Sequence, residues 1–548
     1  MGGPSAHNPV SAGGASPLRL DCDVLIIGGG LSAGWAAIGA ARAGASVILV
    51  DKGYFGTSGV TATAGPGHWW VPPDGDLREQ AIQRRHALSG GLADPHWMAR
   101  IIDQTWRTLP TLAAYYQFPV DDKGVTQYRA LRGPEYLRAL RNLVQDLGVT
   151  ILDHSPALEL LLHDDGAVAG ASGIRRQLNQ AWTIRAAAIV MATGGCAFRS
   201  HLLGAHTNTG DGYLMAAEAG AQLSGMEFSN YYTVAQAKTT MTRSMSYAFA
   251  RYFDSDNREL AIAPGPQMND GLARALLKGA VFCTLDKTPL DIQAQLPQIS
   301  PNVMLPFVRS GIDPYRDRFE VTLRGEGTVR GSGGLRVIDE SCQTSVRGLF
   351  AAGDAATREL IAGATSGGGA QNSAWALSSG LWAGQGAAAL ARKNGRRINT
   401  PVKACGEAGL RPLREVARID SRAVIAAVQR EMLPLDKNLF RSGIGLEKSL
   451  QALDSIWIEI RNHAHAQPSS NAALAIRESA ALTASARWCY RAAQARRESR
   501  GMHQRSDTPA QDAQYDYRLL TGGLDKVWTA ADPRTHASTQ TDMKESVA

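Results

Sequence analysis

The stretch Asp23-Val24-Leu25-Ile26-Ile27-Gly28-Gly29-Gly30-Leu31-Ser32-Ala33-Gly34 decides the fold of this chain. Its apolar run predicts a buried strand, and three successive glycines end that strand at a tight turn. The small and apolar residues over 35–42 predict a helix, and the apolar run over 47–50 predicts a strand that ends on Asp51. This order of elements predicts a parallel βαβ unit and an α/β fold.

The spacing G-x-G-x-x-A-G, with an acid about 20 residues further on, is typical of dinucleotide-binding units. In such a unit Gly28 allows the tight turn, and Gly30 lets backbone N–H groups approach a pyrophosphate. Ala33 or Gly34 allows the helix to pack closely on the strand, and Asp51 binds a ribose hydroxyl. A glycine-rich turn without a ligand is the alternative, and the elements around this turn favour the dinucleotide.

The length and charge of the chain exclude several classes of protein. Its 548 residues predict two to four domains. The net charge is +7, but the lysines and arginines are scattered, so nucleic-acid binding is not expected. The N-terminus does not resemble a secretory signal, and no apolar run reaches about 18 residues, so no transmembrane segment is expected.

The 6 cysteines are far apart and form no C-x-x-C pair. We therefore expect no metal site and no iron–sulfur cluster in the chain itself. Isolated thiols favour a reducing compartment, so a cytoplasmic protein is expected.

The rest of the chain continues the α/β pattern. The loop over 52–70 is rich in small residues, which suits backbone lying flat against a planar ligand; a plain surface loop is the alternative. Helical patterns dominate 77–147. The buried strand over 188–193 ends on Gly194 and brings a second loop to the carboxyl edge of the sheet.

Four further motifs extend the pattern toward the C-terminus. They are Thr207-Asn208-Thr209-Gly210-Asp211-Gly212, Met226-Glu227-Phe228, Gly348-Leu349-Phe350-Ala351-Ala352-Gly353-Asp354-Ala355-Ala356 and Arg496-Arg497-Glu498-Ser499-Arg500-Gly501-Met502-His503. Together with the opening stretch, they resemble the flavoprotein family of succinate dehydrogenase, fumarate reductase, L-aspartate oxidase and adenylylsulfate reductase. The motifs appear in the order of that family and span nearly the whole chain.

The resemblance implies an α/β fold with a Rossmann-like FAD-binding domain of the GR2 type, an inserted α+β capping domain and a C-terminal helical domain. The FAD-binding domain would occupy 20–225 and 330–400, the capping domain 226–329 and the helical domain 401–532. Residues 1–19 are expected to be disordered, and residues 533–548 to form a polar tail.

The resemblance also implies an extended FAD and the residues that contact it. For the pyrophosphate and the adenosine end these are Gly28, Gly30, Ser32, Ala33, Asp51, Lys52 and Ala157. For the isoalloxazine, the ribityl chain and the neighbouring strand ends they are Thr57, Ser58, Gly59, Thr63, Ala64, Gly65, Ala192, Thr193, Gly194, Asp211, Gly353, Asp354, Asn372 and Ser373. A helix from Asn372 would direct its N-terminal dipole at the flavin edge that gains negative charge on reduction.

The chain departs from the family where the substrate would bind. Residues 57–60 contain no histidine for a covalent bond to flavin, so FAD is expected to be non-covalent. Tyr232 replaces one substrate histidine, and Arg330 lies next to the place of another; core packing and a surface position are their alternatives. The arginine that clamps a carboxylate is missing from 363–373.

The family's proton-transfer arginine has no clear counterpart. The stretch Arg324-Gly325-Glu326-Gly327 matches its motif but lies too near the strand that begins at 349, so we interpret the match as chance. Arg243 or Arg251 stands closer to the expected place. The candidate catalytic residues are therefore Arg251, Tyr232, Arg330 and Arg243.

These departures argue against succinate and fumarate, because a small diacid needs a fixed cation at each end. The residues expected around the flavin are aromatic or glycine and predict a wider, flatter pocket for a larger substrate. They are His68, Trp69, Trp70, Tyr231, Tyr232 and 367–369.

The sequence therefore predicts the flavoprotein of an FAD-dependent oxidoreductase that transfers a hydride or electrons. Since the chain is expected to hold no cluster, its electrons would pass to a ferredoxin-like iron–sulfur partner, to oxygen or to a soluble acceptor. The basic net charge suits an acidic partner. A flavin-binding protein without catalysis and a plain NAD dehydrogenase are the alternatives, and the strand expected over 349–354 argues against the second.

Overall fold

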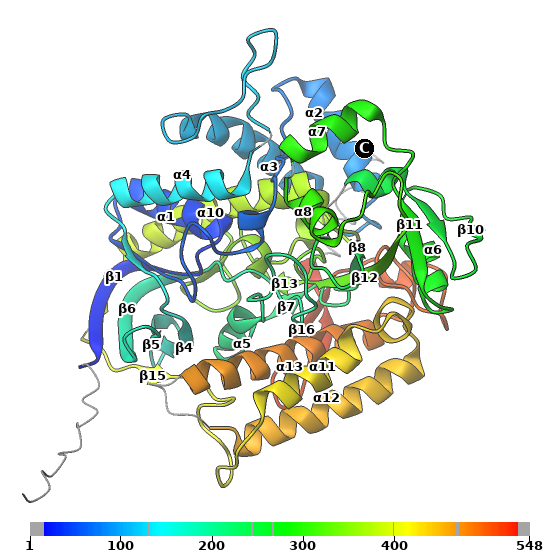
Figure 1. Ribbon diagram of the computed structural model, residues 1–548. Coiled ribbons are helices and arrows are strands. Elements are labelled where there is room, and N and C mark those ends of the chain that lie inside the picture. Colours follow the sequence, from blue (N-terminus) through cyan, green and yellow to red (C-terminus); the bar gives the residue numbers. More distant parts are fainter. Residues whose placement is uncertain are drawn as a thin grey trace, which may run out of the picture.

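A computed structural model describes residues 16–534 except 130, 243–244, 266–267, 300, 398 and 466–470 (Figure 1). The largest sheet has the strand order β15-β4-β5-β6-β1-β2-β3, with β14 beside β6. Its strands are β1 (Leu18–Ile27), β2 (Val47–Val50), β3 (Thr150–Leu152), β4 (Ala157–Leu162), β5 (Val168–Arg175), β6 (Gln180–Met191), β14 (Leu349–Ala351) and β15 (Lys403–Ala404).

The parallel part of this sheet forms around β1, as its apolar run predicts. Val24 pairs with Val47 of β2 on one side and with Ala188 of β6 on the other. β14 pairs in parallel with the last residues of β6, and β3 pairs in parallel with β2. The carboxyl ends of β1, β2, β6 and β14 therefore meet at one edge, where α/β sheets bind ligands.

Helices α1 (Leu31–Arg42) and α10 (Gly368–Asn394) pack backbone to backbone beside this sheet (Figure 1). A Cβ on Gly39 would lie 2.7 Å from the carbonyl oxygen of Leu381, and a Cβ on Gly384 would overlap the carbonyl oxygen of Ala36. A Cβ on Gly380 would lie 2.6 Å from the carbonyl oxygen of Ser32, one turn before the contact of Gly384 with Ala36, so the two helices run in parallel and both N-termini point to the same edge of the sheet. The other helices of this region are α2 (Gly75–Ala87), α3 (Pro95–Thr108), α4 (Gly133–Asp146), α5 (Asp211–Glu218) and α9 (Glu359–Ala362).

The capping region has a separate antiparallel sheet with the strand order β10-β9-β11-β12-β8 (Figure 1). Its elements are β8 (Tyr231–Gln236), β9 (Arg251–Phe253), β10 (Glu259–Leu260), α6 (Met268–Leu276), β11 (Val281–Thr284), α7 (Leu290–Ile299), α8 (Pro301–Ser310) and β12 (Phe319–Gly327). The sheet has its own apolar core, which includes Tyr252, Leu272 and Phe319. This is the α+β insertion that the family resemblance implies.

The C-terminal region contains the long helices α11 (Ser421–Met432), α12 (Gly443–His463) and α13 (Asn471–Ala495). It is not wholly helical, because β16 (Leu519–Gly522) and β17 (Trp528–Ala531) join β7 (Leu223–Ser224) and β13 (Gly334–Leu335) in a third sheet. The predicted three-part α/β architecture is confirmed, with these two strands as an addition. Within the part of the chain that is described, no helix is both long and apolar enough to cross a membrane.

Candidate cofactor and substrate site

A cavity of about 1690 Å³ opens at the carboxyl edge of the large sheet and extends under the capping region. Every residue that the sequence predicts to contact FAD lines this cavity except Ala33. Ala33 is fully buried inside the protein, consistent with its expected role in packing α1 on the strand. Segments from the first 70 residues and from beyond residue 350 therefore meet around one space.

The turn after β1 is shaped for a group that approaches the backbone closely. Gly28 has φ +122°, and a Cβ there would overlap the carbonyl oxygen of Ala192. A Cβ on Gly30 would meet no atom within 4 Å, so the cavity lies open in front of it. Gly30 is also the N-cap of α1, where backbone N–H groups and the helix dipole favour a pyrophosphate.

The part of the cavity that the sequence predicts to hold the adenosine combines a buried acid with a buried ammonium group. The Ser58 hydroxyl donates to Asp51, and burial raises the pKa of the Asp51 carboxyl. Lys52 Nζ lies 2.5 Å from Asp211 Oδ2 and 3.0 Å from Glu478 Oε1. Burial opposes the charge of Lys52, but the two carboxylates outweigh it and raise the pKa of Lys52.

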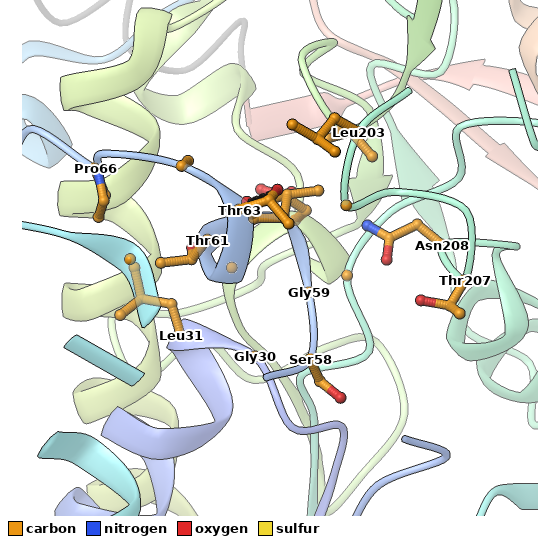
Figure 2. Close-up of a pocket in the computed structure, with 18 of the residues that line it drawn as sticks. Gly30, Leu31, Ser58, Gly59, Thr61, Thr63, Pro66, Leu203, Thr207 and Asn208 are labelled. Atoms are coloured by element: carbon orange, nitrogen blue, oxygen red, sulfur yellow. Dashed lines mark hydrogen bonds between the residues drawn. The ribbon is translucent and has the colours of Figure 1, made fainter. Parts of the chain in front are cut away.

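The part of the cavity that the sequence predicts to hold the flavin lies between two loops that touch each other, since a Cβ on Gly204 would overlap the Thr63 hydroxyl. Figure 2 shows Ser58, Gly59, Thr61 and Thr63 on one loop, opposite Leu203, Thr207 and Asn208 on the other. Figure 2 also places Gly30 and Leu31, at the start of α1, beside them.

Thr193 Oγ1 and Asn372 Oδ1, in the part of the wall formed by the large sheet and α10, are buried and have no hydrogen-bond partner among the described residues. Both belong to the predicted cofactor set, and a bound flavin nucleotide has donors that suit such acceptors. α10 begins at Gly368, so Asn372 lies in its second turn, whereas the sequence predicted a helix from Asn372. The first turns of both α1 and α10 nevertheless line the cavity, so these residues fit FAD.

The substrate side of the cavity is formed by the capping region. Tyr231 and Thr233 of β8 line it, whereas Tyr232 between them does not. Because strand side chains alternate, Tyr232 enters the capping core, and its hydroxyl donates to the Leu433 carbonyl oxygen at 3.1 Å. The structure therefore favours the packing alternative for Tyr232 and presents Tyr231 to the cavity instead.

Arg330 is the predicted catalytic residue that the structure brings to the cavity. Its Nε lies 3.6 Å from Glu326 Oε2, and its guanidinium lies 5.9 Å from the centre of the Tyr231 ring. Glu326 is fully buried and accepts a hydrogen bond from the Thr233 hydroxyl. The stretch over 324–327, interpreted above as a chance match, thus contributes the carboxylate that holds Arg330.

Arg251, another predicted catalytic residue, does not line the cavity. Arg251 lies on β9, where it pairs with Asp286 at 2.5 Å and Glu259 at 3.0 Å. Arg243 lies outside the described residues. Arg324 donates to the Thr239 carbonyl oxygen at 3.1 Å and is also not part of the cavity wall.

Three aromatic residues expected beside the flavin also point elsewhere. His68 is buried with its ring 5.6 Å from that of Tyr136, and burial lowers the pKa of His68 to about 3. Trp70 stacks on Trp106, with ring centres 4.2 Å apart, and Trp69 is buried in the large core. Of the residues from which the wide pocket was predicted, Tyr231 and Gly369 line the cavity.

Sequence reasoning missed most of the substrate side. Its further lining residues come from the segment after β8, from α6, α7 and α8, and from the segment after β12: Met241, Thr242, Tyr247, Phe249, Met268, Asn269, Ile292, Gln295, Leu296, Val303 and Val329. These residues belong to no motif. In the sequence, the amphipathic pattern of the helices is the only indication that some of them face the cavity. Within the described residues, no group of three or more histidine, cysteine, aspartate or glutamate side chains could hold a metal ion.

Comparison with known proteins agrees with this geometry. Residues 23–239 match the FAD binding domain family, and residues 430–534 match the C-terminal domain of the fumarate reductase flavoprotein. L-aspartate oxidase of Mycobacterium tuberculosis is 28% identical over 550 residues, covering 93% of this chain and 97% of that protein. One of the subunits of the fumarate reductase (CoM/CoB) of Methanothermobacter marburgensis is 25% identical over 377 residues, covering 61% of this chain and 67% of that protein.

Solved structures share the fold along nearly the whole chain. A quinol fumarate reductase structure from E. coli superposes with a TM-score of 0.80 at 20% identity and covers 94% of this chain and 97% of that one. Adenylylsulfate reductase from Archaeoglobus fulgidus superposes with a TM-score of 0.74 at 16% identity, with coverages of 95% and 97%. The chain therefore joins an FAD binding domain to a fumarate reductase flavoprotein C-terminal domain, and it is an FAD-dependent oxidoreductase similar to L-aspartate oxidase and fumarate reductase flavoproteins.

Proposed function

We propose that this protein holds FAD non-covalently and oxidises or reduces a substrate other than succinate or fumarate. The observation that carries this proposal is the single continuous cavity. It joins the cofactor residues to a capping wall on which Arg330 is the one charged side chain among the described residues.

The charge of the cavity argues against a small diacid, although the names of two relatives refer to aspartate and fumarate. Each carboxylate of such a substrate needs a cation that is fixed and removed from water. Arg330 supplies one such group. Arg132 also lines the cavity, but 63% of its side chain is exposed and Glu135 lies 3.5 Å away, so water screens its charge.

The described residues that line the flavin part of the cavity support non-covalent binding. The histidines in the cavity wall are His154 and His206. The His154 backbone N–H donates to the Gly53 carbonyl oxygen at 2.7 Å, and burial lowers the pKa of His206. Neither histidine lies within the loop over 57–65, where the resemblance would place a covalent histidine.

When bound, FAD supplies a site that accepts or donates a hydride. The residues of the chain supply the rest: the first turns of α1 and α10 orient the cofactor, and the capping region excludes water. Arg330 and Tyr231 would orient the substrate and stabilise charge at its polar group.

Two electron acceptors remain candidates. A ferredoxin-like iron–sulfur partner suits the net charge of +7, because an acidic partner would be attracted to a basic protein. Oxygen is the other acceptor, and the likeness to an oxidase over 93% of this chain favours it.

Spectroscopy of the purified protein tests this proposal. We expect flavin absorbance in the native protein, and release of all flavin to the supernatant when acid precipitates the chain. Chemically reduced enzyme mixed anaerobically with fumarate should stay reduced. The reduced enzyme is then mixed with air, where rapid reoxidation indicates an oxidase and slow reoxidation indicates an enzyme that needs an electron-transfer partner. A colourless protein, flavin that precipitates with the chain, or rapid reoxidation by fumarate would contradict the proposal.

A further inference from the structure

We propose that the capping side of the cavity binds a substrate with a mostly apolar body and one polar end, a carbonyl or a single carboxylate, directed at Arg330 and Tyr231. This inference rests on the proposed function and names the class of substrate for the same site.

The first observation is the apolar wall opposite the cofactor residues. Its side chains come from β8 and the segment after it, from α6, and from the helix pair α7–α8, so they surround the chamber on several sides. They are Val234, Met241, Phe249, Met268, Ile292, Leu296, Val303 and Val329. An apolar body that displaces water from such walls gains free energy in proportion to the apolar surface that it buries.

The second observation is that two polar groups of this wall are engaged within the protein. The Thr233 hydroxyl donates to Glu326, and Asn269 Nδ2 donates to the Tyr232 carbonyl oxygen at 2.7 Å. The Thr242 hydroxyl and Asn269 Oδ1 are uncharged and have no partner among the described residues, so the charged group of this wall is Arg330, beside the Tyr231 ring.

The third observation is the charge balance at this polar end. Arg330 faces the cavity while the fully buried Glu326 lies 3.6 Å behind it, so the two charges largely cancel. Such a pair offers guanidinium N–H donors without a large excess of positive charge. It suits a carbonyl oxygen or one carboxylate, whereas the second carboxylate of a diacid would lie unpaired against the apolar wall.

A matched series of three compounds tests this inference on the FAD-loaded protein. Fumarate has two carboxylates on one double bond, trans-cinnamate replaces one of them by a phenyl ring, and benzalacetone also replaces the other by a methyl ketone. Each is titrated while the absorbance of the bound flavin is recorded, which measures binding without turnover. We expect trans-cinnamate, benzalacetone or both to bind at least about tenfold more tightly than fumarate. Tighter binding of trans-cinnamate would identify the polar end of the substrate as a carboxylate, and tighter binding of benzalacetone would identify it as a carbonyl.

Two variants locate the contact. Arg330→Gln keeps a polar side chain of similar reach, and it should weaken binding of trans-cinnamate about tenfold or more and of benzalacetone less, because the carboxylate loses an ionic partner. Arg274→Gln is the matched control, since Arg274 lies on α6 outside the cavity with 64% of its side chain exposed. Flavin content and melting temperature show whether each variant is folded.

The outcomes separate this inference from the proposed function. Fumarate binding as tightly as the aromatic compounds, binding of neither aromatic compound, or unchanged binding in Arg330→Gln would overturn the inference while leaving the flavoenzyme in place. Protein that retains no flavin would overturn the proposed function itself.

Discussion

At the scale of single residues, the carboxyl groups of Glu227 and Glu359 are buried together behind the cofactor-binding region. Arg496 Nε donates to Glu227 Oε1 at 2.7 Å, and the Ser224 hydroxyl donates to Glu359. Burial, followed by repulsion from Glu227, raises the pKa of Glu359 to about 8. One arginine thus neutralises one of the two acids, and the other keeps its proton at neutral pH.

This buried acid makes stability depend on pH. Between the ordinary pKa of 4.5 and about 8, the folded protein holds a proton that the unfolded chain releases. The contribution of Glu359 to the free energy of unfolding is therefore full at low pH and is lost as the pH rises through this range. Glu359→Gln should remove that loss and stabilise the protein above pH ~8 by on the order of 2 kcal/mol, with little effect near pH ~5.

Urea unfolding of wild type and Glu359→Gln at both pH values measures this difference. Glu447→Gln, on the exposed face of α12, serves as the control and should leave the pH dependence unchanged. A variant that is no more stable than wild type at high pH would show that Glu359 is ionised in the folded protein.

At the scale of elements, the cofactor site depends on the contact between α1 and α10. Gly384 lies against the carbonyl oxygen of Ala36, and Gly39 lies against the backbone of Leu381. This contact keeps the first turns of both helices at one edge of the sheet, where they line the same cavity.

A methyl group at this contact should separate the helices. We expect Gly384→Ala to lower the free energy of unfolding by about 2 kcal/mol or more, because overpacking against rigid backbone is not relieved by a side-chain rotation. FAD affinity should fall with it, which flavin fluorescence titration measures. Gly75→Ala on α2 is the matched control, because a Cβ there meets no atom within 4 Å. Equal stability of the two variants would mean that α1 and α10 shift apart at little cost.

The elements also show which structural features follow from the local sequence and which depend on contacts between distant segments. The strand over 24–27, the glycine turn and the helix after it follow from local patterns, so this strand–turn–helix unit was predictable from the sequence. Whether Tyr231 or Tyr232 faces the cavity depends on which face of β8 packs against the capping core. The pairing of β8 with β12, about 90 residues away along the chain, determines that face. Likewise, no local pattern reveals that His68 and Trp70 turn inward or that α7 and α8 close the chamber.

At the scale of the whole molecule, the cavity wall draws on segments from Ile27 to Glu478. A ligand that contacts segments so far apart in sequence stabilises the folded chain as a unit. Removal of FAD should therefore lower the melting temperature of the entire protein. Added FAD at about 100 times its Kd should raise the free energy of unfolding by about 2.7 kcal/mol.

Calorimetry with and without added FAD checks this expectation. Riboflavin at the same concentration is the control and should restore less, because it has no adenosine to reach Asp51. A melting temperature that is insensitive to FAD would contradict the assignment of the cavity.

The ion pair between Lys52 and Glu478 has a consequence for biosynthesis. α13 supplies both Glu478 and Leu474 to the adenosine end, so this end is closed by a helix near the end of the chain. A ribosome makes the glycine turn more than 400 residues before it reaches Leu474 and Glu478. A nascent chain therefore lacks this wall when its glycine turn has already formed, and we expect it to retain flavin only after α13 has been translated.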